Sequence, residues 1–351
     1  MPPAAVRRPL TVTAWLAMSC LCLALSPLLL AIGALASALT RRPQPLLLAR
    51  LVIAYFAREL AVLVACAALW VASGFGARMH SRRSQRMHFR LLHWFVHSIA
   101  QRALNLLEIE VVPEFSPETA RRLQRDAPLL FFSRHAGPGD TVLLIDQLLT
   151  RYGRLPSVVF KETLAIDPCV DLIGHRLPHA VLDTSDADEC EALIEQVAAK
   201  LGPRGALVLF PEGGNFTAQR RRRALRSLWR KGRRREAAAG RAMTHMMPPH
   251  PTGALAALRA SPNADVIFAA HTGLGLAAFP RELWRHTPIG KTLKTRLWLA
   301  PAAERPDDQQ EQVKWLYDWW KRLDDWVEAQ GEEPAVDDGG RESITAPPLA
   351  P

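Results

Sequence analysis

Short apolar runs alternate with segments of helical pattern along most of the chain, and this alternation limits the folds that the chain can adopt. Several runs are unbroken, such as "PLLFFS" and "GALVLF", as expected of strands buried on both faces. The strand-like runs are residues 109–115, 128–133, 156–161, 179–184, 205–214, 244–247 and 264–273. Segments of helical length separate them. The sequence therefore predicts an α/β fold in which helices flank a sheet.

The first part of the chain is strongly apolar. No charged residue occurs from Pro9 to Thr40, and a second uncharged segment runs from Leu60 to Ala77. About 20 apolar residues are enough to cross a bilayer, so these segments predict an N-terminal hydrophobic helical hairpin in the membrane. Two alternatives stay open. The first segment also has features of a cleaved signal, and Arg41 and Arg42 between the segments also permit a hairpin that enters only one leaflet.

The basic residues indicate an orientation. Much of the net charge of +10 is local. Five arginines follow the second apolar segment: Arg78, Arg82, Arg83, Arg86 and Arg90. Basic flanks favour the cytoplasmic side, so we expect a protein of the cell membrane whose remaining chain faces the cytoplasm. The five cysteines have no ligand-like spacing, which agrees with a reducing compartment and indicates no zinc site.

Four regions are expected. Residues 1–9 form a basic N-terminal segment, residues 10–77 contain the two membrane helices, and residues 78–330 form the folded domain. Residues 331–351 are acidic and rich in Pro and Gly, which predicts a disordered tail. Within the folded domain, residues 88–108 and 309–328 have the apolar spacing of amphipathic helices.

The stretch "FFSRHAGPGD" carries the first chemical signal. His135 lies just after a buried strand, and Asp140 lies at the start of the next helical segment. Ligands of α/β proteins gather beyond the carboxyl ends of strands. There the carboxylate can hold one imidazole nitrogen and leave the other to remove a proton. No G-x-S-x-G motif accompanies the pair, so the nucleophile would belong to the substrate, most naturally an alcohol. A His that ends a strand and an Asp that caps a helix would explain the spacing without catalysis.

Further polar motifs follow other strand-like runs. "FKETLAIDP" contains Lys161 and Glu162, "FPEGG" contains Glu212, and "HMMPPHPTG" follows the run at residues 244–247. Polar groups at several strand ends on one edge of a sheet make a binding site. His271 also ends a strand-like run, and as an isolated histidine it is interpreted as structural.

The order of "HAGPGD", "FKETLAIDP", "FPEGG" and "MMPPHPTG" resembles the glycerolipid acyltransferase family, which includes 1-acylglycerol-3-phosphate and lysophospholipid acyltransferases. The resemblance covers roughly residues 85–280, with the motifs within residues 130–280. It implies that His135 of the HX4D motif is the general base and that Asp140 is its partner. The acceptor's hydroxyl would attack the thioester of acyl-CoA or acyl-carrier protein, and neither a metal nor a cofactor would be needed.

The resemblance also implies the substrate-binding residues, which are Lys161, Phe210, Pro211, Glu212, Gly213, Gly214 and Pro248. The family often has Thr-Arg after F-P-E-G, where this chain has Gly214 and Asn215, and Asp183 is followed by Thr184 rather than by arginine. These departures bring the motifs closest to the lysocardiolipin and lysophosphatidylinositol branch. Lys161 or the arginines of residues 220–235 would then contact phosphate.

We therefore expect a membrane-bound O-acyltransferase that moves a fatty acyl group to a lysophospholipid in phospholipid biosynthesis or remodelling. Alternatives are a 1-acylglycerol-3-phosphate or glycerol-3-phosphate acyltransferase and, in another class, a non-catalytic membrane protein that binds lipid. The basic run at residues 220–235 fits attraction to anionic membrane phospholipids. A solvated helix face or a nucleic-acid arm would give the same pattern. No nucleic-acid partner is expected, because Trp229 is the only aromatic residue among these charges and a membrane anchor is predicted in the same chain.

Overall fold

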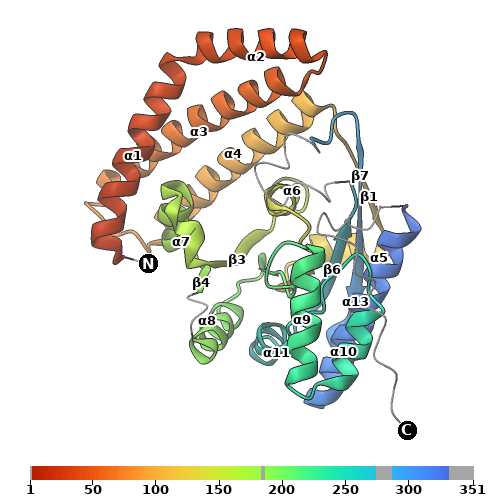
Figure 1. The fold of residues 1–351 in the computed structure, drawn as a ribbon. Coiled ribbons are helices and arrows are strands. Elements are labelled where there is room, and N and C mark those ends of the chain that lie inside the picture. Colours follow the sequence, from red (N-terminus) through yellow and green to blue (C-terminus); the bar gives the residue numbers. More distant parts are fainter. Residues whose placement is uncertain (1, 183–185, 274–286, 332–351) are drawn as a thin grey trace.

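The computed structural model describes residues 2–182, 186–273 and 287–331, and it has the predicted α/β fold (Figure 1). Seven strands form one sheet in the order β1-β7-β6-β2-β5-β3-β4. Their bounds are β1 Glu110–Phe115, β2 Leu129–Ser133, β3 Leu155–Lys161, β4 Ala180–Leu182, β5 Gly205–Leu209, β6 Asp265–His271 and β7 Thr292–Ala300. The strands from β6 to β4 are parallel, whereas β7 is antiparallel to β6 and parallel to β1.

Helices cover both faces of the sheet. The bounds in the folded domain are α4 Arg82–Leu107, α5 Pro117–Gln124, α6 Pro138–Thr150, η1 Glu162–Ile166, α7 Pro168–Arg176, α8 Ala187–Ala199, α9 Ala218–Arg230, α10 Arg234–Arg241, α11 Pro251–Ala260, η2 Ala302–Glu304 and α13 Gln309–Ala329. Because side chains alternate along a strand, Leu130 and Phe132 of β2 pack with α8, α11 and α13. Leu129 and Phe131 face α5 and α6. In Figure 1, α6 lies on the opposite side of the sheet from α8 and α11.

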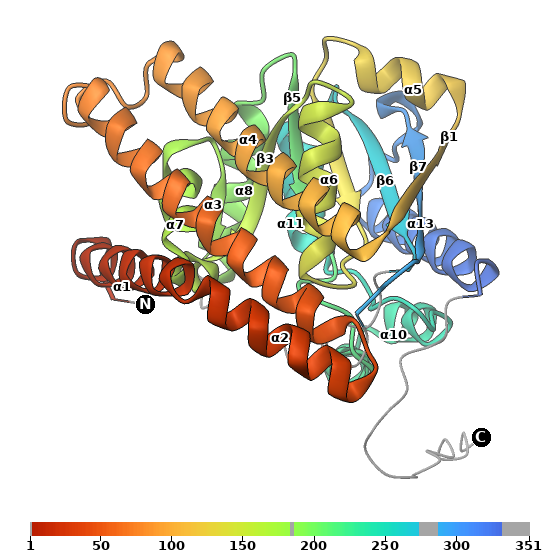
Figure 2. The same cartoon turned by 90° about the horizontal axis from the view of Figure 1, so that it is seen from above.

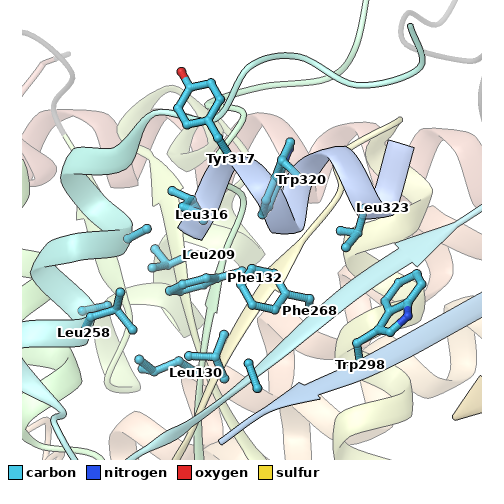
Figure 3. Packing of buried hydrophobic residues seen from close by; sticks show 14 of the residues in the cluster. Leu130, Phe132, Leu209, Leu258, Phe268, Trp298, Leu316, Tyr317, Trp320 and Leu323 are labelled. Atoms are coloured by element: carbon cyan, nitrogen blue, oxygen red, sulfur yellow. The ribbon is translucent and has the colours of Figure 1, made fainter. Parts of the chain in front are cut away.

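Aromatic side chains of α13 close one half of the core (Figure 3). Phe268 of β6 stacks on Trp319 with ring centroids 4.5 Å apart, and Trp320 is fully buried beside it. This arrangement confirms the amphipathic helix predicted at residues 309–328. Complete burial of a ring as large as that of Trp320 contributes strongly to hydrophobic stabilisation.

The apolar N-terminal region forms three helices where two were predicted. They are α1 Ala4–Ala24, α2 Ser26–Thr40 and α3 Gln44–Ala72. The uncharged segment breaks at Leu25, where α1 and α2 meet at 63°. Pro27 lies in the first turn of α2, and its ring and missing N–H prevent a continuous helix there. Helix α3 is long and apolar enough to cross a membrane by itself. Helices α1 and α2 are long and apolar enough only if the bent pair is taken as one span.

The second apolar helix was predicted at residues 60–77, and α3 instead begins 16 residues earlier. A tertiary contact accommodates the guanidinium of Arg58 in this helix, because its Nε donates a hydrogen bond of 3.0 Å to Oγ of Ser98 on α4. The helix ends at Ala72, and Gly74 and Gly76 with positive φ form the turn that follows. Figure 2 shows α1 and α2 along one edge of the molecule with α3 beside them.

Ion pairs attach the N-terminal helices to the folded domain. The predicted basic segment is part of α1, and Arg7 and Arg8 each lie 2.9 Å from the fully buried carboxylate of Asp171 on α7. Arg7 also pairs with Glu162 at 3.0 Å. The helices therefore pack as part of the domain.

Other local predictions differ from the structure. Residues 244–247 are not a strand, because their backbone amides bind carboxylates: Thr244 and His245 donate to Asp324, and Met247 donates to Glu212. The basic run at residues 220–235 forms two helices, α9 and α10, and not one. Strand β7 and helix α5 were not predicted. The acidic tail, apart from residue 331, and Asp183 and Thr184 lie outside the described residues.

Arg154 generates a prediction about stability. This fully buried side chain follows α6 and donates hydrogen bonds to the backbone carbonyls of Arg122, Leu123, Arg125, Ala127 and Pro203. We expect Arg154→Met to lower the free energy of unfolding by about 3 kcal/mol or more, because buried carbonyls would lose their donors. Chemical denaturation in detergent measures this. The more exposed Arg204 bonds to the same region, so Arg204→Met is the control. Equal losses in both variants would contradict the prediction.

Candidate active site

The strand register brings the predicted site residues to one edge of the sheet. Phe132 of β2 pairs with Leu209 of β5, so His135 and Glu212 lie three residues beyond the same level. Val158 of β3 pairs with Val208, which places Lys161 at the level of Pro211. Parallel neighbours end at the same edge, and the motifs therefore meet there although they are distant in sequence.

The His135 imidazole and the Asp140 carboxylate form a hydrogen-bonded pair. Nδ1 of His135 lies 3.1 Å from Oδ1 and 3.2 Å from Oδ2 of Asp140. The His135 side chain is 18% exposed and the Asp140 side chain is 2% exposed. A substrate can therefore reach the imidazole but not its partner. Because the carboxylate occupies Nδ1, the nitrogen left for proton transfer is Nε2, which hydrogen-bonds to none of the described residues.

Local backbone geometry fixes the Asp140 carboxylate. Its Oδ2 accepts hydrogen bonds from the amides of Ala136 at 2.7 Å and Gly137 at 3.0 Å, and its Oδ1 accepts one from the Thr141 hydroxyl at 3.1 Å. Burial by itself would raise the pKa of Asp140, but the imidazoles of His135 and His271 outweigh it and hold this pKa well below its usual range. The carboxylate therefore stays ionised while it orients His135.

His271, interpreted from sequence as structural, contacts Asp140 of the His135–Asp140 pair. Its Nε2 lies 3.3 Å from Oδ2 of Asp140, and its side chain is 9% exposed. Neither ring nitrogen hydrogen-bonds to a described residue. Ser133 of β2 pairs with Ala269 of β6, so His271 and His135 both lie two residues past the same level. The position of His271 at the end of its strand was the available signal, but the strand order was not known from sequence.

Glu212 joins two loops at the base of the site. Its Oε1 accepts a hydrogen bond of 3.2 Å from the amide of His135, and its Oε2 accepts one of 3.3 Å from the amide of Met247. The side chain is 1% exposed. Arg134, which sequence reasoning missed, is also buried, and it donates to the carbonyls of His271 and His245 at 2.5 and 3.2 Å. Glu212 therefore links the backbone of His135 to that of Met247.

The "FPEGG" segment lies directly against His135. The rings of Phe210 and His135 are 4.4 Å apart between centroids. The carbonyl of Pro211 accepts a hydrogen bond of 2.7 Å from the amide of His250. Gly213 has a φ of +69°, and a Cβ there would come within 3.1 Å of His250. The turn therefore needs glycine at this position for both its backbone conformation and its close packing.

Positive charges surround the same turn. A Cβ added to Gly214 would lie 2.9 Å from Nη1 of Arg220, so this guanidinium lies over the glycine. Desolvation and then the charges of Arg233, Lys231 and Lys161 lower the pKa of His250. Lys161, at the end of β3, is exposed. The turn thus lies in a cationic environment that favours an anion.

Pro248, also predicted to bind substrate, packs against α10. It is buried, and its ring packs so closely on α10 that a Cβ at Gly240 would lie 2.9 Å from it. Its contact with Gly240 supports the loop behind the "FPEGG" turn. None of the clusters of metal-ligand type among the described residues includes His135 or Asp140.

Glu212 generates a prediction about pH. Burial raises its pKa to about 7, against the opposing effects of Arg134 and the two amides. Between about pH 4.3 and 7 the folded chain holds a proton that the unfolded chain has released. The contribution of protonated Glu212 to the free energy of unfolding is therefore fully present below this pH window. It is lost as pH rises through 7, and the loss is on the order of 3 kcal/mol.

Glu212→Gln removes this titration. We expect urea unfolding between pH 4 and 8 to show that the wild type loses stability relative to Glu212→Gln as pH rises. Exposed Glu118, changed to Gln, is the control and should show no such divergence. A difference that does not vary with pH would contradict the raised pKa.

Comparison with known proteins assigns the class of chemistry. Residues 114–260 match the family model described as acyltransferase. Among solved structures, the crystal structure of the 1-acyl-sn-glycerophosphate (LPA) acyltransferase PlsC from Thermotoga maritima is similar at 15% identity and a TM-score of 0.47, over 78% of this chain and 97% of that one. No curated protein matched the chain. The matched segment contains His135, Asp140 and Glu212, and the chain is an acyl-transferring enzyme with an acyltransferase domain.

Proposed function

We propose that the protein transfers a fatty acyl group from acyl-CoA or acyl-carrier protein to the free hydroxyl of a lysophospholipid, in phospholipid synthesis or remodelling. The observation that carries the proposal is the pairing of the partly exposed His135 with the buried, ionised Asp140. A non-catalytic lipid-binding role is set aside because residues 114–260, which contain His135 and Asp140, match the family model described as acyltransferase.

The pair supports a direct transfer. Nε2 of His135 removes the proton of the acceptor hydroxyl as the oxygen attacks the thioester carbonyl, and Asp140 stabilises the resulting imidazolium. The carbon–sulfur bond then breaks, and the imidazolium returns the proton to the leaving thiolate. This sequence uses no side-chain nucleophile, and it leaves an ester on the acceptor and a free thiol on the donor.

The charges around the "FPEGG" turn support an anionic acceptor. Arg220 lies over Gly214, and Lys161 is close enough to His250 for its charge to lower the pKa of that imidazole. We assign Arg220 to the acceptor phosphate, in the place of the arginine that the turn itself lacks. Within the lysophospholipids, we propose lysocardiolipin or lysophosphatidylinositol as the acceptor. A 1-acylglycerol-3-phosphate or glycerol-3-phosphate acceptor, with its phosphate in the same place, is the alternative.

Apolar surfaces support a lipid substrate and a membrane location. The lining of one pocket includes Asp140 and His271 together with the apolar side chains of Leu143, Leu144 and Leu297. The exposed apolar side chains of α1 and α2 include Leu10, Leu21, Leu28, Ile32, Leu35 and Leu39. Such a surface is expected in a bilayer rather than in water. We propose that these helices hold the enzyme at the cell membrane, with the catalytic domain on the cytoplasmic side.

The first test concerns the base. We expect His135→Ala to lower the rate of acyl transfer by about 10²- to 10⁴-fold, because no other group replaces the base. Asp140→Asn should also lower it, because the amide cannot stabilise the imidazolium. Transfer of labelled acyl groups by purified protein measures both, and circular dichroism checks folding. Near-normal transfer by folded His135→Ala would overturn the mechanism.

The second test concerns the acceptor. We expect Arg220→Gln to raise the apparent KM for an anionic lysophospholipid by about tenfold, the cost of one charge-assisted hydrogen bond. The turnover at saturation and the KM for a zwitterionic lysophospholipid should change little. Initial rates in mixed micelles measure this. Arg226 is exposed on another side of α9, so Arg226→Gln is the matched control. Equal effects of the two substitutions would mean that Arg220 contributes only to the general positive charge of the surface and does not bind the acceptor phosphate specifically.

A further inference from the structure

We propose that His93, His97 and Asp146 form a binding site for a divalent transition-metal ion of the Zn²⁺ class, which joins α4 to α6. His93 and His97 are one helical turn apart, so they lie on the same face of α4. Helices α4 and α6 pack against each other (Figures 1 and 2), and the carboxylate of Asp146 on α6 contacts His97. The possible ligand atoms of the three residues all lie within 4.8 Å of one another.

The donor set suits such an ion. Two imidazole nitrogens and one carboxylate oxygen are ligands that Zn²⁺ commonly takes, with water in the fourth position. Nδ1 of His97 lies 2.8 Å from Oδ1 of Asp146. Tetrahedral bonds of about 2.1 Å separate ligand atoms by about 3.4 Å, so this pair must open by about half an ångström. The side chain of His97 is 42% exposed, and water can therefore complete the tetrahedron.

The surroundings hold the carboxylate in place. Asp146 is 2% exposed, and its Oδ1 accepts a hydrogen bond of 2.9 Å from the hydroxyl of Thr150. That hydroxyl also lies 3.0 Å from Nε2 of His93. In metal sites, a hydrogen bond from a neighbouring group to a ligating carboxylate fixes its orientation, and the Thr150 hydroxyl donates such a bond to Asp146. A simple hydrogen-bonded pair would explain His97 and Asp146, but it would give His93 no role beyond a contact with the Thr150 hydroxyl.

The position of the site indicates its effect. Asp146 lies six residues after Asp140 on α6, which is about 9 Å along the helix axis. An ion there is too distant to contact the reacting atoms. It would instead fasten α4 to the helix whose first turn carries the partner of His135. The expected consequence is stabilisation of the folded chain by bound metal.

The test uses the full chain in detergent after dialysis against EDTA. We expect Zn²⁺ titration by calorimetry to show one saturable site per chain, and the thermal unfolding midpoint to rise with Zn²⁺. Visible absorption of added Co²⁺ reports the coordination number. His93→Gln, His97→Gln and Asp146→Asn should each weaken binding by at least about tenfold. His80, exposed before α4, provides the control as His80→Gln, which should bind like the wild type.

Two outcomes would overturn the proposal. One is the absence of saturable Zn²⁺ binding by the wild type. The other is unchanged affinity in His93→Gln and Asp146→Asn, which would mean that zinc binds elsewhere and that the three residues form only a hydrogen-bonded contact. Asp146→Asn keeps the shape of the side chain, and a circular dichroism spectrum like that of the wild type would show that weaker binding reflects the lost ligand and not unfolding.

Discussion

Asp140 is buried with its two oxygens shared among two backbone amides, a hydroxyl and the imidazole of His135, with the imidazole of His271 also in contact. A buried carboxylate is costly unless its oxygens are satisfied, and here the donors come from the turn that carries the base. The turn, the first helical turn of α6 and the orientation of His135 therefore depend on one another.

A second buried acid extends this dependence to the rest of the site. Glu212 binds the amide of His135 on one side and that of Met247 on the other. Arg134 reaches the backbone of β6 and of the loop before Pro248. The strand-end loops are thus joined through buried polar groups, which specify one arrangement because each group would be costly without its partner.

Ion pairs and helix packing fix the apolar helices to the catalytic domain. Arg7 and Arg8 pair with the buried Asp171, and α3 packs on α4 and α7. A membrane-bound α1 and α2 would therefore fix how the domain sits on the bilayer, because these ion pairs and packing contacts join the two parts. This arrangement suits an enzyme whose proposed acceptor is a lipid in the membrane.

The sequence by itself determined the features that local pattern encodes. Unbroken apolar runs marked β2, β5 and β6, and the five-residue spacing of His135 and Asp140 marked the pair, because both ends of that contact lie in one turn. The prediction missed β7, although Lys294 and Arg296 alternate there with Leu293, Thr295 and Leu297, which is a strand pattern. The role of His271 and the extent of α3 were decided by the tertiary structure. Strand order placed His271 beside Asp140, and a neighbouring helix supplied Ser98 for Arg58. Contacts between residues so distant in sequence depend on which elements pack together, and no local periodicity carries that information.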